Sequence, residues 1–305
     1  MTPTPAQDYA KLHFIVLIWG FTAILGALIT VPAVEIVFYR TLISFLALGA
    51  LLYFRRQSFR IGSQQIFKIL GTGVLIALHW ILFFASAQIS TVSVCLAGMA
   101  TCSFWTSFIE PALNKRKIRV FEVVLGLVVI VGLYIIFRFE FDHVLGLSLA
   151  VVSAMLSALF SVINGKLAKR HNPYMITFYE MIGAWLGTLA FIPIYVSYFA
   201  ENGQIQWTPS YMDWLYLSIL ALFCTVYAYS VSVELMKRIS AFVVNLTVNL
   251  EPVYGIILAL LIFGEKEQMG SGFYLGTLII LLSVLAYPVV NKYYKRKALP
   301  LDNLR

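Results

Sequence analysis

Residues 240–263 read SAFVVNLTVNLEPVYGIILALLIF, a stretch that contains one charged residue, Glu251, and no basic one. A helix needs about 20 predominantly apolar residues to cross a bilayer, so this stretch is long enough to cross once. Similar apolar runs occupy residues 12–30, 33–54, 67–88, 91–112, 120–138, 144–168, 174–198, 212–235 and 272–291. The sequence therefore predicts an all-α integral membrane protein with ten transmembrane helices.

The composition excludes a soluble enzyme. Of the 305 residues, 61% are hydrophobic and 12% are charged, whereas about a quarter of residues are charged in soluble proteins. Ten spans leave no room for a domain outside the membrane. Cys95, Cys102 and Cys224 all fall inside apolar runs, which predicts neither a disulfide framework nor a metal-binding cysteine pair.

The basic residues indicate the orientation, because positive charge in short loops marks the cytoplasmic side of a membrane protein. With the N-terminus inside, 19 of the 22 lysines and arginines lie on the cytoplasmic side, mostly within 55–68, 115–119, 166–170, 237–238 and 292–305. We therefore expect both termini to be cytoplasmic. Since these residues are spread over short loops and do not form one folded basic face, no nucleic-acid partner is expected.

Comparing the chain with itself at an offset of 150 residues indicates an internal duplication. The ungapped offset aligns Ser90 with Ser240, Val94 with Val244, Leu96 with Leu246, Leu125-Gly126 with Leu275-Gly276 and Ile130 with Ile280. Phe38-Tyr39 also recurs as Phe178-Tyr179. We predict two five-helix repeats, residues 1–141 and 142–305, and because five is odd the second is inverted. Inverted repeats build many transporters and place the substrate near the midplane between them.

Short motifs in a fixed order also resemble a known family, the EamA-type transporters of the drug/metabolite transporter superfamily. The matching residues are Trp19-Gly20, Pro32 before the span that carries Arg40, Leu250-Glu251-Pro252, Gly264-Glu265 and Gly276. The first half departs from the pattern, because Cys102 replaces a proline within a span and Lys115 replaces a loop glutamate. The resemblance covers the whole chain and implies a ten-helix exporter of small polar metabolites, often amino acids, with a central cavity.

Three ionisable residues, Arg40, Glu180 and Glu251, lie deep within predicted spans. Such residues are costly in lipid and usually functional. Arg40 and Glu180 follow the duplicated Phe-Tyr pair, so inverted symmetry directs both toward the middle. They could pair across the cavity, or Arg40 could hold a substrate carboxylate while Glu180 holds an amine or a proton. Glu251 could likewise accept a coupling proton. The alternative is that these residues only fix helix packing.

The ninth span contains a predicted break. Pro252 lacks an amide hydrogen, which frees the carbonyl of Val248 and bends the helix. Asn245, Asn249 and Pro252 share one face of the helix, and Thr247, Glu251 and Tyr254 share another. We expect one face to line the cavity and the other to bond neighbouring helices, and the periodicity favours neither. The alternative for the two asparagines is helix packing.

Several aromatic and histidine side chains complete the candidate substrate site. His79-Trp80 lies in the middle of the third span, and the 150-residue offset sets His79 opposite Tyr229. A histidine can titrate near neutral pH or donate to a substrate. Trp19, Trp105 and Tyr227 could supply an aromatic wall. Packing alone is the competing interpretation for each of these side chains.

The leading hypothesis is a secondary transporter in a bacterial cytoplasmic membrane. It would export a small polar, amino-acid-like metabolite by alternating access, with the proton as a candidate coupling ion. No cofactor and no enzymatic activity are expected, and the protein should be a monomer or weak homodimer. Competing hypotheses are a passive channel, a membrane subunit that transports nothing, and an intramembrane lipid-linked transferase. The transferase would need paired acids or clustered histidines, whereas the four histidines are scattered.

Overall fold

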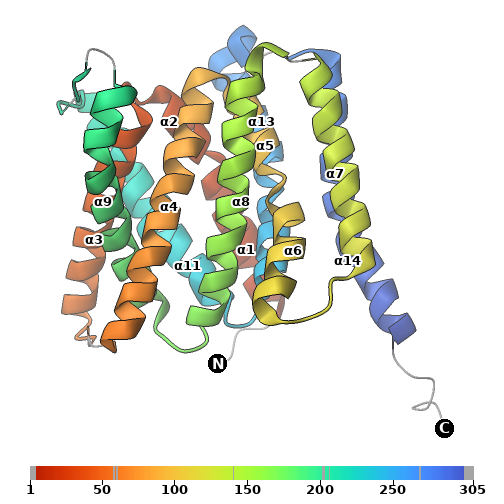
Figure 1. Ribbon diagram of the computed structural model, residues 1–305, viewed down its shortest axis with the longest axis horizontal. Coiled ribbons are helices and arrows are strands. Elements are labelled where there is room, and N and C mark those ends of the chain that lie inside the picture. The colour runs from red at the N-terminus through yellow and green to blue at the C-terminus, as the bar shows by residue number, and fades with distance from the viewer. Residues whose placement is uncertain are drawn as a thin grey trace.

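The computed structural model describes residues 5–57, 59, 61–139, 141–200, 203–205, 207–267 and 269–298. Within these residues the regular structure is entirely helical, and the helices run side by side as one bundle (Figure 1). Arg60 and Arg305, which contributed to the predicted orientation, lie outside the described residues.

Eight helical segments of the described chain are long and apolar enough to cross a membrane. They are Ala6–Leu28, Ala33–Phe54, Ser63–Ile89, Val92–Asn114, Val144–Leu167, Pro173–Tyr198, Tyr211–Leu235 and Ala241–Phe263. Two shorter apolar stretches, Val120–Gly132 and Ser271–Ser283, lie within longer helices. The chain is therefore a multi-pass membrane protein, and every predicted apolar run coincides with a helical segment.

Six of the ten helical segments are continuous helices. Five of them are α3 (Ala33–Phe54), α4 (Ser63–Ile89), α7 (Val120–Phe139), α8 (Val144–Leu167) and α9 (Pro173–Tyr198). The C-terminal helix α14 (Ser271–Ala298) is also continuous and packs along α7. Short 3-10 helices precede α8 and follow α13, at Phe141–His143 and Gly264–Glu267.

The remaining four segments are interrupted. They comprise α1 (Pro5–Gly20) with α2 (Thr22–Leu28), α5 (Val92–Met99) with α6 (Cys102–Asn114), and α12 (Ala241–Val248) with α13 (Glu251–Phe263). The fourth consists of α10 (Tyr211–Ile219), a π-helix η3 (Leu220–Tyr227) and α11 (Ala228–Leu235). The predicted break at Pro252 is confirmed, because α12 ends at Val248 and the proline lies in the first turn of α13. The break after Met99 and the π-helix were not predicted.

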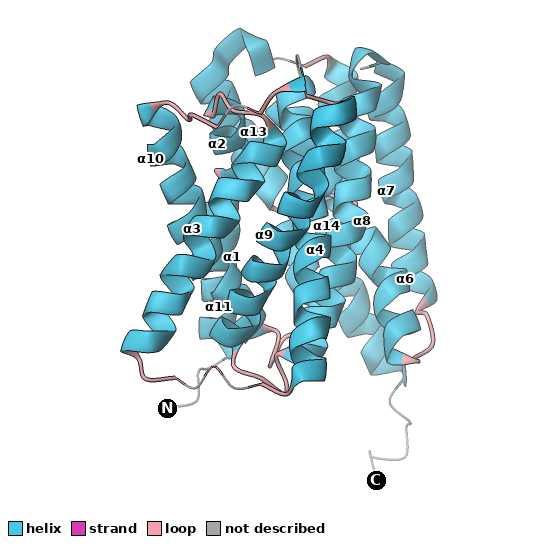
Figure 2. Ribbon diagram, turned by 60° about the vertical axis from the view of Figure 1, so that its left-hand side comes forward, coloured by secondary structure: helices cyan, strands magenta, loops and turns pink. Residues whose placement is uncertain are grey.

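Close packing of α4 against α9 brings the two predicted repeats together. A Cβ added to Gly73 of α4 would overlap the backbone of Glu180, and one added to Gly183 of α9 would overlap the backbone of Leu70. Small residues at such positions let helix backbones approach closely in membranes. This contact fixes Glu180 against the centre of the bundle. Figure 2 shows α3, α9 and α4 crossing in front of the bundle.

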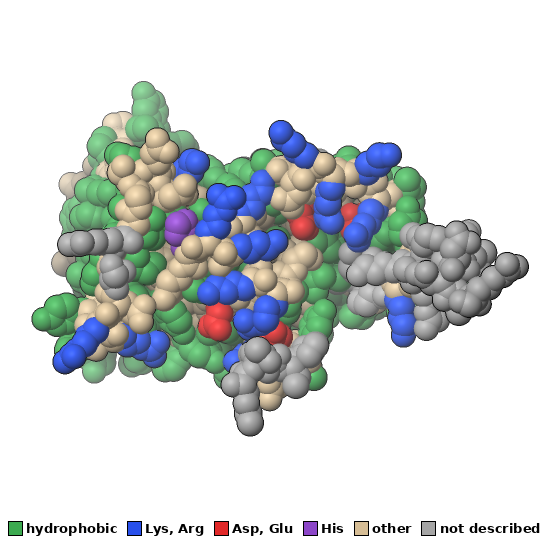
Figure 3. Space-filling model, turned by 90° about the horizontal axis from the view of Figure 1, so that it is seen from below, with side chains coloured by type: hydrophobic (Ala, Val, Ile, Leu, Met, Phe, Trp, Pro, Cys, Tyr) green, Lys and Arg blue, Asp and Glu red, His purple; other side chains and the backbone are tan. Residues whose placement is uncertain are grey.

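The two ends of the described chain lie at the same face of the bundle. Helix α1 begins and α14 ends at the lower face in Figure 1. Figure 3 views this face directly, and lysine and arginine side chains gather across it, with few acidic ones. We call it the basic face.

Candidate functional site

A cavity of about 80 Å³ lies inside the bundle and is lined by α1, α2, α3, α4, α5, α8, η3, α11, α12 and α13. Both predicted repeats therefore contribute to its wall. Seven of the candidate site residues line it: Trp19, Arg40, His79, Trp80, Tyr229, Asn245 and Glu251. Its volume is enough for several water molecules, since one needs roughly 10–15 Å³ on this measure.

Arg40 of α3 is the cationic side chain in this cavity wall and is 1% exposed. Its guanidinium carbon lies 3.8 Å from the centroid of the Trp80 ring. Its Nε donates to Oγ1 of Thr225 at 2.8 Å, while its Nη1 is buried and has no hydrogen-bond partner among the described residues. A charged arginine at membrane depth costs about 2.5–3.5 kcal/mol on insertion scales, so an unpaired N–H here points to a missing acceptor.

The π-helix explains how Arg40 is held. Widening the turn leaves backbone carbonyls available, and Thr225 Oγ1 donates to the carbonyl of Leu220 at 2.9 Å while it accepts from Arg40. The backbone carbonyl of Cys224, in the same π-helix, accepts a hydrogen bond from the indole N–H of Trp19 at 3.0 Å. Single-turn π segments often occur at functional sites. Here one such segment orients two of the candidate side chains.

Glu251 begins α13 and is the acidic side chain in the cavity wall, 6% exposed. It interacts electrostatically with Arg40, yet no ion pair within 4.0 Å joins the two in the described structure. The cavity therefore contains one cation and one carboxyl group that do not neutralise each other by direct contact.

Glu180 of α9 lies behind the cavity wall and is fully buried. Its Oε2 accepts from the hydroxyl of Tyr229 at 3.2 Å, and that hydroxyl accepts from Nδ2 of Asn164 at 2.7 Å. The pairing of Arg40 with Glu180, one alternative from the sequence, is not formed in the described structure: no ion pair within 4.0 Å joins them, and Arg40 donates to Thr225 while Glu180 accepts from Tyr229. Glu180 adjoins the cavity wall through Tyr229 and Asn164, both of which line the cavity.

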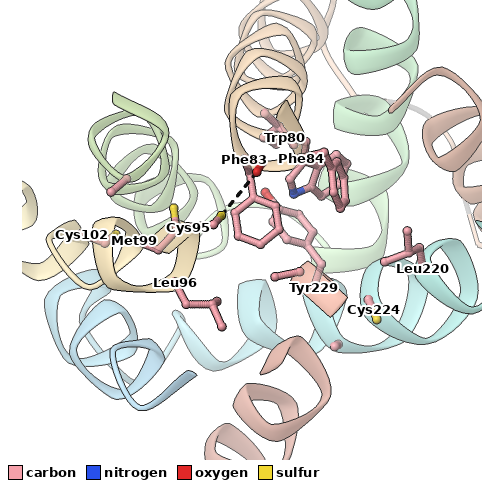
Figure 4. Close-up of a cluster of buried hydrophobic side chains, with 14 of the residues drawn as sticks. Trp80, Phe83, Phe84, Cys95, Leu96, Met99, Cys102, Leu220, Cys224 and Tyr229 are labelled. Atoms are coloured by element: carbon pink, nitrogen blue, oxygen red, sulfur yellow. Dashed lines mark hydrogen bonds between the residues drawn. The ribbon is translucent and has the colours of Figure 1, made fainter. Parts of the chain in front are cut away.

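His79 is fixed through one ring nitrogen. Its Nδ1 lies 2.7 Å from Oγ of Ser153 and 3.0 Å from the Ser153 carbonyl, and its ring contacts Phe160 edge-on at 5.3 Å between centroids. Nε2 is the nitrogen left for the cavity. The apolar side of the same wall is visible in Figure 4, where Trp80 and Phe83 lie near Tyr229.

The ninth span presents to the cavity a face that neither predicted stripe describes. Val244, Val248 and Glu251 line the cavity, with Asn245 at their flank. Both asparagines bond to α6, Asn245 to Thr106 at 2.9 Å and Asn249 to Ser103 at 2.6 Å. Asn249 is thus a buried helix contact outside the cavity wall. Val244, Val248 and Glu251 are spaced as i, i+4 and i+7, so the cavity face lies between the two stripes that the sequence singled out.

Tyr227 lies outside the cavity. Its side chain is 42% exposed and its ring meets that of Phe14 edge-on at 6.4 Å between centroids. Tyr227 ends the π-helix and lies two residues before Tyr229, which is about half a helical turn, so the two side chains point to opposite sides of the segment. It does not belong to the aromatic wall.

Sequence reasoning missed Thr225, Asn164 and the cavity-lining Ser157 and Ser161. Thr225 gives no signal in sequence, because hydropathy does not report the π-helix that positions it. Asn164 follows Ser153, Ser157 and Ser161, whose spacing along α8 is typical of helix packing. The described residues contain no group of three or more His, Cys, Asp or Glu placed to hold a metal ion.

Comparisons with known proteins agree with this arrangement. A sequence model described as the EamA-like transporter family matches residues 12–138 and 144–287. The chain is 30% identical over 182 residues to the pseudopaline exporter CntI of Pseudomonas aeruginosa strain UCBPP-PA14, a match to 58% of this chain and 61% of that protein. The CntI of strain PAO1 is 31% identical over 170 residues, 54% of this chain and 57% of that protein.

The chain thus spans about three fifths of the length of the curated relatives it matches. In addition, a crystal structure superposes with a TM-score of 0.68 at 15% identity, covering 93% of this chain and 98% of the other. At that identity the likeness concerns the fold alone.

Proposed function

Because the chain belongs to the EamA-like transporter family, we propose that it is a secondary transporter that exports a small, polar, amino-acid-like metabolite by alternating access. The observation that carries this proposal is an arginine and a carboxyl group that line one cavity without an ion pair within 4.0 Å in the described structure. Arg40 has a buried Nη1 with no hydrogen-bond partner among the described residues, and Glu251 lines the same space. A zwitterion complements both.

Each end of an α-amino acid has a partner of suitable chemistry. Guanidinium groups bind carboxylates with well-defined geometry, and hydrogen bonds that involve charged groups are the stronger ones. Glu251 would take the ammonium group. Trp80 and Phe83 offer apolar surface to the substrate side chain. The name of the CntI relatives supports export of a small metabolite.

The same proposal includes the topology. Helices α7 and α14 would join the eight long segments as ten spans, arranged as inverted repeats 1–141 and 142–305. The two separate matches to the family model support this division, and the basic face at both chain ends supports cytoplasmic termini. The bacterial source of the relatives supports a location in the cytoplasmic membrane.

Protons remain the candidate coupling ion. Glu180 has no cationic partner in the described structure and touches the cavity wall through Tyr229. If it carries the coupling proton, Glu180→Gln should bind substrate while its flux no longer responds to a pH gradient. A monomer or weak homodimer suffices, because one chain supplies the whole cavity.

The test is flux from liposomes that hold the purified protein and labelled amino acids. We expect Arg40→Ala and Glu251→Gln to abolish flux while the protein inserts normally, since each removes one end of the zwitterion site. Arg55→Ala and Glu234→Gln are matched controls, because both lie outside the cavity. Wild-type flux in both site variants would remove the two residues from the substrate site.

A further inference from the structure

A second hollow, of about 280 Å³, opens at the basic face. Its wall comes from α6, from α8 and from the 236–241 connection between α11 and α12. We call it the basic vestibule. It is larger than the central cavity, and its lining is dominated by polar and basic side chains.

The basic vestibule adjoins the central cavity. Met236, only 5% exposed, lines both spaces. Along α8, Asn164 lines the cavity and the next residues, Gly165 and Lys166, line the vestibule. The Met236 side chain is therefore part of the partition between the vestibule and the substrate site.

The charge around the basic vestibule is strongly positive. Four basic side chains line it, Lys166, Lys169, Lys237 and Arg238, against a single acid, Glu110. That acid is already engaged, since its Oε2 accepts from the backbone N–H of Phe242 at 3.1 Å and lies 3.3 Å from Arg116. Glu110 therefore does not neutralise the lysines.

Two of the four basic groups are also engaged. Arg238 donates twice to Asp8, at 2.6 and 2.8 Å, and Lys166 donates to the carbonyl of Leu113 at 2.6 Å. Lys169 and Lys237 have no acidic partner within 4.0 Å in the described chain. They approach the hollow from different segments, the turn that follows α8 and the α11–α12 connection.

We propose that the basic vestibule is a second binding subsite, with Lys169 and Lys237 as its anchors, for small molecules that carry two or more carboxylates. Since the inference rests on the proposed function, the vestibule holds such a substrate before Met236 moves and admits it to the central cavity. The protein then favours exported metabolites with more than one carboxylate over simple neutral zwitterions.

The orientation rule for membrane proteins accounts for basic residues on this face, but not for their convergence on a hollow next to the substrate cavity. Two ammonium groups on different walls match a ligand with separated carboxylates. A concave site lined by one sign of charge also concentrates oppositely charged solutes. Because the lysines are exposed, the attraction should weaken as salt screens it.

Citrate is a suitable probe, because it carries three carboxylates and no ammonium group for Glu251. We expect wild-type protein in phosphatidylcholine nanodiscs to bind citrate by calorimetry at low salt, more weakly as salt is added. Lys169→Gln with Lys237→Gln should weaken binding at least tenfold. Lys68→Gln is the matched control, since Lys68 is an exposed lysine of α4 that does not line the vestibule.

Arg40→Ala separates this inference from the proposed function. Citrate binding should persist in that variant, whether or not amino-acid flux does, because the vestibule does not include Arg40. The inference is overturned if wild-type protein does not bind citrate, if the double variant binds it as tightly, or if Lys68→Gln or Arg40→Ala weakens binding as much as the double variant does.

Discussion

Arg40 is held firmly yet left one hydrogen bond short. Its Nε donates to Thr225 and its guanidinium group lies over the Trp80 ring, whereas Nη1 has no hydrogen-bond partner in the described structure. Thr225 is fully buried, and its hydroxyl donates to the Leu220 carbonyl. That hydrogen bond orients the hydroxyl, which in turn fixes the position of the Arg40 guanidinium. Thr225 is therefore a positioning residue for the proposed substrate carboxylate.

Replacing Thr225 with valine tests this role, since valine keeps the shape and removes the hydroxyl. A hydrogen bond to a charged group contributes about 1.5–3 kcal/mol, so we expect the substrate concentration for half-maximal flux to rise about tenfold or more. Thr225→Ser should restore it, which a purely structural role for the threonine methyl group would not predict. Unchanged half-saturation in the valine variant would show that Thr225 does not position Arg40.

At the scale of elements, α4 and α9 approach closely because a glycine on each helix faces the backbone of the other. A Cβ at Gly73 would overlap the backbone of Glu180, whereas one at Gly71, two residues earlier and on the opposite face of the helix, meets nothing within 4 Å. The two glycines occupy the same helix and differ only in what they face.

These neighbours provide a matched pair of substitutions. We expect Gly73→Ala to destabilise the protein by about 1–3 kcal/mol, the usual cost of overpacking a well-packed contact. Gly71→Ala should be neutral or stabilising, because alanine favours helix over glycine by about 1 kcal/mol. Thermal unfolding in detergent, followed by fluorescence size-exclusion chromatography, measures both. Equal transition temperatures for the two variants would contradict the close α4–α9 contact.

Elements were largely predictable from the sequence, and their interruptions were not. The apolar run at 33–54 is α3 with the same bounds, because an uninterrupted apolar stretch of that length forms a membrane-spanning helix. The break between Met99 and Cys102 has no proline, and Thr101 Oγ1 bonds the Gly98 carbonyl there. Such local bonds, like the π-helix, depend on tertiary contacts that hydropathy does not report.

The sequence predicted how deep each candidate residue lies in the membrane, but not the direction in which its side chain points. Arg40 lines the cavity as inverted symmetry suggested, and so does Glu251, whereas Glu180, which the same symmetry directed toward the middle, lies behind Tyr229. Sequence gives the distance of a side chain from each membrane face. It does not give the rotation of a helix, which packing such as the Gly73 contact decides.

At the scale of the whole molecule, the predicted repeats are tied together at both faces. At the basic face, Arg238 binds Asp8 through two hydrogen bonds, and that hydrogen bond raises the pKa of Arg238. At the other face, Asp213 accepts from both the backbone N–H and the hydroxyl of Thr30, each at 2.7 Å. The cavity lies between these two contacts, as expected for a transporter that opens to one side at a time.

Weakening either contact should favour opening on its own side. We expect Asp8→Asn to increase the accessibility of the cavity from the basic face, and Asp213→Asn to increase it from the opposite face, because each loses charge-assisted hydrogen bonds. Labelling of a cavity cysteine by an impermeant reagent, applied to one side of oriented vesicles, measures the shift. Shifts in the same direction would contradict independent closures at the two faces.

The most direct test of the account is the accessibility of Ser157, which lines the cavity from α8. In protein with Cys95, Cys102 and Cys224 replaced by alanine, we would introduce Ser157→Cys and apply an impermeant maleimide to right-side-out and inside-out vesicles. Alternating access predicts labelling from both sides, reduced by a transported amino acid and restored when Arg40→Ala is added. Labelling from one side only, or labelling from both that no amino acid reduces, would contradict a central substrate site that opens to each side in turn.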